Sequence, residues 1–146
     1  MASVSVSVDL PISPGEAWAK LTDLGGWSEW LVIHQAWKGV LPEPSEIRVG
    51  TQITQVVAVM GMANKIDWTI NEFNAPKTVT IAGTGMAGVQ IEFTLRAEPV
   101  GTGTSATIDA SFTGAMIVGP IGKAVAKSAQ ADLAQSLATL AELLAA

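Results

Sequence analysis

Serine and valine alternate strictly along the start of the chain, from Ser3 to Asp9. Side chains two residues apart lie on the same face of a β-strand, so this pattern predicts a half-buried strand with inward-facing Val4, Val6 and Val8. The string Ser13-Pro14-Gly15-Glu16 comes next. It has the form of a capping box, in which the serine hydroxyl accepts a hydrogen bond from the glutamate backbone N–H. We therefore expect a strand followed by a short helix.

A second short helix and six further strands are expected in the middle of the chain. Gly25-Gly26 interrupts the first helix, and Trp27, Trp30 and Leu31 then recur at helical spacing. This spacing predicts a second short helix that ends near Ile33. Runs rich in β-branched residues follow, separated by glycine- or proline-rich turns. The expected strands are Gln35 to Gly39, Thr51 to Met60, Met62 to Phe73, Lys77 to Ala82, Val89 to Glu98 and Thr104 to Thr113.

The hydrophobic period becomes helical from Gly119-Pro120 to the end of the chain. One apolar stripe is expected there, made of Ile121, Val125, Ala129, Leu133, Leu137, Leu140 and Leu144. Residues 1–146 therefore read as a single α+β domain. It should have a curved antiparallel sheet of about seven strands around a long C-terminal helix, with two short helices after the first strand.

Composition and charge narrow the class of protein. Of the 146 residues, 49% are hydrophobic and 14% are charged, which predicts a compact chain with a substantial core. The net charge is -5 and the eight basic residues are scattered, so nucleic acid is not expected as a partner. The chain contains no cysteine, which excludes disulfides, thiolate metal sites and cysteine nucleophiles and suits a reducing compartment.

The chain shows neither a targeting signal nor a membrane span. The first ten residues lack a charged leader and a continuous apolar run, so a cytoplasmic protein is expected. The most apolar stretch, residues 115–146, contains two lysines and two carboxylates, which would be costly in a bilayer core. We expect a water-exposed helix there.

Strand alternation sends apolar side chains inward and almost every ionisable strand residue outward. General acid-base catalysis needs titratable groups that converge in a concave site, so the pattern favours binding over catalysis and indicates no catalytic residue, metal or cofactor. The inward positions can line a ligand cavity or simply fill a core, and the pattern leaves both open. The last helix is expected to face the sheet with many alanines, which would leave space for a ligand, although alanine is also the best helix former. These alanines are Ala124, Ala126, Ala129, Ala131, Ala134 and Ala138. The apolar candidates for ligand contact are Val57, Val59, Trp68, Ile70, Ile81, Ile91, Phe93, Phe112, Val125 and Ala129.

Four residues could give this interior a polar contact. Trp30 and Trp68 each combine an apolar ring with one N–H donor that could orient a ligand oxygen. His34 is the sole histidine, and it could move protons or make a local hydrogen bond. Gln55 lies in phase with Val57 and is expected to point inward, either as a ligand contact or as a hydrogen-bonded core amide.

The glycine-rich string at residues 83–88 has the spacing of a dinucleotide fingerprint. That motif binds phosphate only where a strand leads into a helix N-terminus. A strand is expected to follow here, so the string predicts a hairpin turn.

The order of elements and several strings resemble the SRPBCC superfamily, the START-like helix-grip proteins that include polyketide cyclases and lipid-transfer domains. The strings are Leu10 to Trp18, Trp27-Ser28-Glu29-Trp30, Val49-Gly50-Thr51 and the terminal helix. The resemblance covers nearly the whole chain. It implies a helix-grip fold and an internal cavity for a hydrophobic small molecule, such as a lipid or a polyketide-like compound.

Three further strings look like an actinobacterial subgroup of that superfamily: Trp30 to Trp37, Leu41-Pro42-Glu43 and Gly61 to Ile70. Some members are described as toxins of two-gene toxin-antitoxin pairs. The resemblance therefore implies two alternatives to simple ligand binding. One is a polyketide aromatase/cyclase that uses a polar residue such as His34, and the other is a toxin neutralised by a small antitoxin-like protein.

Overall fold

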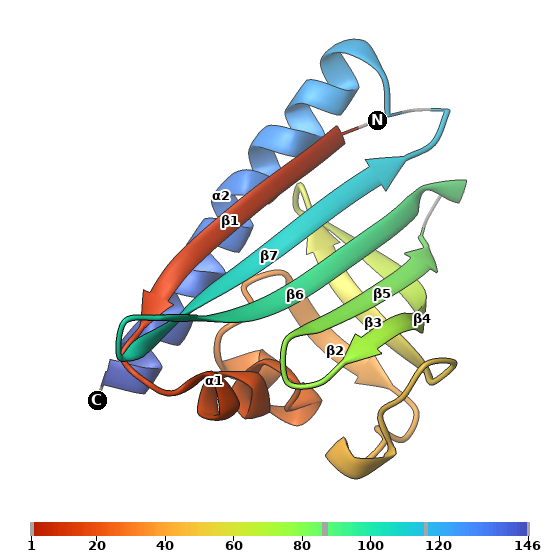
Figure 1. Ribbon diagram of the computed structural model, residues 1–146. Coiled ribbons are helices and arrows are strands. Elements are labelled where there is room, and N and C mark those ends of the chain that lie inside the picture. Colours follow the sequence, from red (N-terminus) through yellow and green to blue (C-terminus); the bar gives the residue numbers. More distant parts are fainter. Residues whose placement is uncertain (1, 86–87, 116, 146) are drawn as a thin grey trace.

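Seven strands form one antiparallel sheet in the computed structural model, which describes residues 2–85, 88–115 and 117–145, without the side chains of Pro44, Val59 and Ala145. The strand order is β1-β7-β6-β5-β4-β3-β2, and each strand is antiparallel to its neighbours (Figure 1). The expected α+β helix-grip architecture is confirmed. The strands are β1 (Ala2–Leu10), β2 (His34–Lys38), β3 (Gln52–Val59), β4 (Met62–Asn74), β5 (Thr78–Thr84), β6 (Gln90–Val100) and β7 (Gly103–Thr113).

Two short helical segments follow β1, as expected. The first, α1 (Pro14–Leu21), is capped by Ser13, whose hydroxyl accepts from the Glu16 backbone N–H at 3.3 Å. The second, η1 (Leu24–Glu29), is a 3₁₀ helix that ends earlier than the expected Ile33. Its two glycines are poor formers of an α-helix, which accounts for the tighter and shorter form. A third short 3₁₀ segment, η2 (Pro44–Glu46), was not expected.

The long helix α2 (Gly119–Ala145) covers the inner face of the sheet and packs most closely along β1 (Figure 1). Its buried residues include Val125, Leu133, Leu137 and Leu140. Ile121 was predicted to begin this stripe but is 51% exposed, because the first turn of α2 extends beyond the surface that it covers.

The expectation that many alanines of α2 face the sheet is wrong for most of them. Ala126 and Ala129 pack against the core. Four others lie on the solvent side of α2, namely Ala124, Ala131, Ala134 and Ala138. Their abundance therefore reflects helix propensity rather than space for a ligand.

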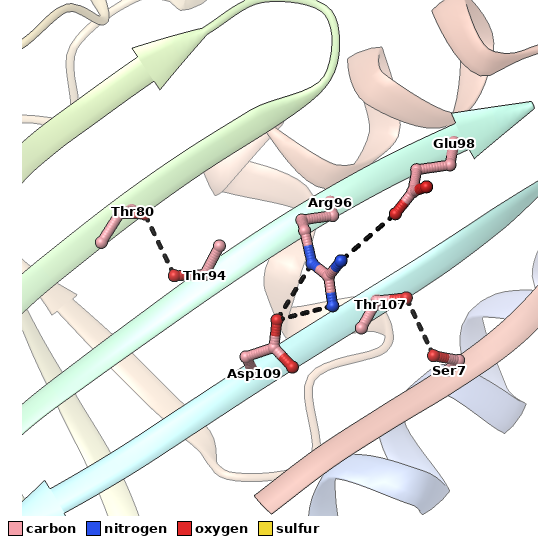
Figure 2. A network of polar contacts seen from close by, with 7 residues as sticks. All are labelled: Ser7, Thr80, Thr94, Arg96, Glu98, Thr107 and Asp109. Carbon is pink, nitrogen blue, oxygen red and sulfur yellow. Dashed lines mark hydrogen bonds and ion pairs between the residues drawn. The ribbon is translucent and has the colours of Figure 1, made fainter.

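The outer face of the sheet is polar and hydrogen-bonded across strands (Figure 2). The Arg96 guanidinium donates to the Asp109 carboxylate at 3.0 Å and 2.8 Å and to Glu98 at 3.2 Å. Thr80 bonds Thr94, and Ser7 bonds Thr107. Since Arg96 lies outside on this face, as alternation predicts, it does not reach the interior.

The glycine-rich string forms the β5–β6 hairpin, as predicted, although Met86 and Ala87 lie outside the described residues. The Gly85 N–H donates to the Val89 carbonyl at 2.8 Å, and strands flank the turn on both sides. A Cβ on Gly83 would lie 2.5 Å from the Asp67 backbone oxygen. This glycine therefore allows close approach of β4 and β5.

Candidate functional site

The inner face of the sheet brings the predicted apolar candidates together beneath the helices. Eight of them are buried: Val57, Trp68, Ile70, Ile81, Ile91, Phe93, Phe112 and Val125. Ala129 is half-buried, and the side chain of Val59 lies outside the described residues. Phe93 is central among them, because its ring contacts Trp68 at 5.2 Å and Phe112 at 6.4 Å between centroids.

Two small voids lie within this apolar interior, each of about 20 Å³. The first lies between the sheet and α2 and is lined by residues that include Ile33, Val57, Phe93, Phe112 and Ala129. The second lies under α1 and η1, where Ile70 and Ile81 contribute to its wall. Each void has room for about one water molecule, whereas a drug-sized ligand occupies about 300 Å³ or more. Around these two voids the candidates therefore pack as a core.

Three polar side chains form a hydrogen-bonded chain inside the apolar surroundings. Trp68 Nε1 donates to Gln55 Oε1 at 2.9 Å, and Gln55 Nε2 lies 2.7 Å from His34 Nδ1. Gln55 and Trp68 are 0% and 1% exposed, and His34 is half-buried at the start of β2. Both ends of the Gln55 amide are thus hydrogen-bonded within the core.

The direction of this chain is set by Trp68, because an indole N–H can only donate. Gln55 must therefore accept from Trp68 through its oxygen and donate to His34 through its amide nitrogen. His34 Nδ1 must then be unprotonated, so the neutral ring carries its proton on Nε2. Burial lowers the pKa of His34 below the ordinary value of 6.5. The hydrogen bond from Gln55 acts in the same direction, because it favours the neutral ring.

Trp30 differs from the neighbouring tryptophans in having a buried indole N–H without a hydrogen-bond partner within the described residues. Trp27 Nε1 donates to the Leu21 carbonyl, and Trp37 Nε1 donates to the Leu24 carbonyl, each at 2.9 Å. Trp30 is 2% exposed and its ring packs edge-on against Trp27 at 6.1 Å. A buried donor without an acceptor is destabilising, so this atom calls for an explanation.

Ser136 on α2 makes a structural contact that was not predicted from the sequence. Its hydroxyl accepts from the Val32 backbone N–H at 2.9 Å and donates to the Asp132 carbonyl at 2.8 Å. Ser136 is 0% exposed and joins α2 to the segment between Trp30 and His34. A polar residue flanked at helical spacing by Leu133 and Leu140 was the signal that could have identified it.

The outer face of the sheet carries a larger but open depression of about 630 Å³. Its lining is mostly polar, with Asp67, Thr69, Gln90 and Glu92, and Ile91 is the one sequence-predicted site residue in it. An open polar depression of this kind does not remove an apolar ligand from water. Among the described residues, no three His, Cys, Asp or Glu side chains gather into a group that could hold a metal ion. In the same part of the chain, no helix has the length and apolarity that a membrane crossing requires.

Burial of His34 makes the stability of the fold depend on pH. Since the folded pKa of His34 is lowered, the unfolded chain binds a proton at pH values where the folded chain does not. The free energy of unfolding is therefore expected to fall as the pH decreases below about 6.5, and to level off below the folded pKa. Urea unfolding of the wild type across this range measures the effect.

His34→Asn is the matched variant for this measurement, because its amide oxygen can accept from Gln55 and does not titrate. The wild type should lose more stability than His34→Asn between mildly basic and mildly acidic pH. An equal loss in both proteins would show that His34 is not the responsible group.

Three comparisons with known proteins agree with this architecture. A model of the family described as polyketide cyclase / dehydrase and lipid transport matches residues 1–145. Toxin Rv0910 of Mycobacterium tuberculosis (strain ATCC 25618 / H37Rv) is 39% identical over 137 residues, which make up 94% of each chain. Uncharacterized protein Rv1546 of the same strain is 36% identical over 143 residues, covering 98% of this chain and 99% of that protein. A solved START superfamily protein from Mycobacterium smegmatis has a TM-score of 0.80 at 17% identity and 99% coverage of both chains.

The family model matches nearly the whole chain, and the solved structure shares the curved sheet and the long helix. This chain therefore belongs to the polyketide cyclase / dehydrase and lipid transport family.

Proposed function

We propose that this protein binds a hydrophobic small molecule that carries a hydrogen-bond acceptor, such as a carbonyl, between the sheet and its helical cover. The observation that carries the proposal is the buried, unpartnered Nε1 of Trp30 in an otherwise apolar interior. A ligand oxygen would supply the missing acceptor, while the aromatic and aliphatic walls would remove the remainder of the ligand from water. The description of the family, which includes lipid transport, supports the same class of ligand.

Binding requires the closed interior to open, because neither void of about 20 Å³ holds more than a water molecule. The void beneath α2 marks the place for this opening. Its walls belong to different elements, with Ile33 before β2, Val57 on β3 and Ala129 on α2. Ser136 joins two of these elements by its hydrogen bond to Val32, and such a bond contributes only about 1 kcal/mol. A ligand that separates α2 from the β2–β3 side would enlarge this void.

The chain from Trp68 to His34 would form a fixed polar wall of that space. Gln55 already accepts from Trp68 and uses one of its two N–H donors on His34, so its main contribution is to fix the orientation of these two rings. In the cyclase alternative, His34 would have to accept or release a proton. Its Nδ1 is occupied by Gln55, which leaves Nε2 for that role. This geometry favours binding over proton transfer.

Filling the void beneath α2 tests the location of the site. Ala129→Leu should lower ligand affinity about tenfold or more, because the added carbons occupy the space into which the ligand must expand. Ala134→Leu makes the same change on the exposed side of α2 and should bind as the wild type does. Native mass spectrometry with a panel of fatty acids and polyphenols identifies a bound class, and equilibrium dialysis gives the affinities.

Circular dichroism and thermal unfolding of both variants establish that they are folded before binding is compared. No complex between the wild type and any member of the panel would reject the proposal. Equal affinity of the two folded leucine variants would place the ligand elsewhere.

Removing the Trp30 N–H tests the polar contact separately. The affinities of 2-acetylnaphthalene and 2-isopropylnaphthalene differ mainly through the carbonyl oxygen. In Trp30→Phe the preference for the ketone should fall by about fivefold, which corresponds to about 1 kcal/mol for one neutral hydrogen bond. Trp37→Phe is the control, because Trp37 already donates to the Leu24 carbonyl. An unchanged preference in Trp30→Phe would exclude this donor.

A second candidate function is growth inhibition as the toxin of a two-gene pair, which the printed name of a relative with 39% identity supports. Induced expression of this chain alone should then arrest growth, and co-expression of a short open reading frame from beside its gene should restore it. Normal growth at a soluble expression level confirmed by immunoblot would count against this role. Ala129→Leu in the same assay tells whether inhibition depends on the interior.

A further inference from the structure

One end of the sheet gathers the turns that lie nearest the void beneath α2. Because neighbouring strands are antiparallel, the β3–β4 turn, the β5–β6 hairpin and the β7–α2 connection all lie at the same end as the start of β2. In Figure 1 this is the upper end, where β7 ends and α2 begins. The void itself contacts Ile33 and Ala58, which belong to the segments that reach this end.

Large hydrophobic side chains are exposed at this end, and we call them the apolar end. They are Val32, Met60, Met62, Val118 and Ile121, with exposed fractions of 49%, 51%, 61%, 58% and 51%. They come from three separate segments. Val32 lies just before β2, Met60 and Met62 lie at the β3–β4 turn, and Val118 and Ile121 lie at the start of α2. Five of the nine large hydrophobic side chains that are exposed among the described residues lie at this end. Apolar side chains that share one surface in water carry a cost, so we take this end as a candidate contact surface.

Charge separates this end from the remainder of the molecule. The segments that build it, residues 31–36, 58–66, 83–91 and 110–131, contain none of the 13 carboxylate residues. They contain three of the eight basic residues, Lys65, Lys123 and Lys127, and all three are exposed. The nearest carboxylates are Asp67 and Glu92, which lie level with Thr84 and Ser111 on the neighbouring strands. The three lysines exceed these two carboxylates, so the apolar end is slightly cationic in a protein whose net charge is -5. An anionic partner is the complement of this surface.

We propose that the apolar end docks on the surface of an anionic lipid bilayer. Met60, Met62, Val118 and Ile121 would enter the boundary between headgroups and acyl chains, and the lysines would lie at the level of the lipid phosphates. The carboxylates elsewhere on the molecule would orient it with this end toward the membrane. The docked end adjoins the void beneath α2, but docking does not depend on the ligand proposal.

The residue types favour a bilayer over a protein partner. Protein interfaces are anchored mainly by tryptophan, tyrosine and arginine. The segments of the apolar end contain none of these three residue types and expose methionine, valine, isoleucine and lysine instead. Flexible aliphatic side chains with lysines nearby match the disordered interior and the mobile phosphates of a lipid surface.

Vesicle flotation of the full chain tests the proposal without any transferred ligand. At low salt the protein should float with vesicles of equal parts phosphatidylglycerol and phosphatidylcholine, and it should remain unbound with phosphatidylcholine alone. Lys123→Gln/Lys127→Gln should lower the vesicle affinity about tenfold or more, since each lysine at an anionic surface contributes several-fold. Met60→Asn/Met62→Thr should weaken binding at low and at high salt, because it removes apolar insertion; asparagine also tolerates the positive φ of 52° at Met60.

Matched control variants lie at the opposite end of the sheet. Lys38→Gln/Lys77→Gln removes two exposed lysines there, and Val49→Thr/Val100→Thr removes two valines that are 61% and 51% exposed. Both should float as the wild type does. Absence of flotation with anionic vesicles, or equal weakening by the control pairs, would overturn the proposal. A dimer in size-exclusion chromatography that Met60→Asn/Met62→Thr dissociates, with no flotation, would overturn it in favour of a second copy as the occupant.

Discussion

A curved sheet of seven strands presents more apolar inner surface than one helix can cover. The helix α2 packs along β1 and makes few contacts with β3, so the inner surface of β4, β5 and β6 needs another cover. That cover consists of α1, η1 and residues 30–33, which precede β2. The interior is thus closed by two independent parts, and the line along which they meet contains the void between Ile33, Val57 and Ala129.

The second part of the cover is held by indole hydrogen bonds rather than by regular secondary structure. Trp27 ties η1 to the end of α1 through the Leu21 carbonyl, and Trp37 ties β2 to η1 through the Leu24 carbonyl. Trp68 is fixed by Gln55. Each of these donors makes a bond that its burial requires. Trp30 alone among these four buried or half-buried indoles has no acceptor within the described residues, and its ring packs against Trp27 of η1. This is why the ligand proposal depends on Trp30 more than on the larger set of apolar residues.

Local periodicity predicted most of the fold, because strand residues two positions apart point to the same face of the sheet. The alternation in β6 correctly separated Ile91 and Phe93 from Glu92 and Arg96. Periodicity did not predict burial at positions where burial depends on how far one element extends over another. Ile121 fits the stripe of α2 but lies past the edge of the sheet, and four alanines of α2 face solvent.

The candidate site was predicted less completely than the fold, for the same reason. The sequence indicated Trp30, His34, Gln55 and Trp68 as polar candidates, but their pairing depends on the register between β2, β3 and β4. Register brings Gln55 opposite Ile66 and Trp37, and only then is Gln55 in reach of both Trp68 and His34. The volume of the interior depends on the packing of all these elements together, so neither alternation nor composition could distinguish an open cavity from a closed core.

Val32 connects the closed interior to the apolar end. Its side chain is 49% exposed at that end, while its backbone N–H donates to Ser136 and so holds α2 against the segment before β2. A surface that binds the Val32 side chain would therefore contact the same residue whose backbone N–H joins the two parts of the cover. A single neutral hydrogen bond contributes about 0.5–1.5 kcal/mol, and each buried methylene group returns about 0.8 kcal/mol. In the proposed docking, insertion of a few side chains of the apolar end would therefore be of sufficient magnitude to offset the loss of this bond.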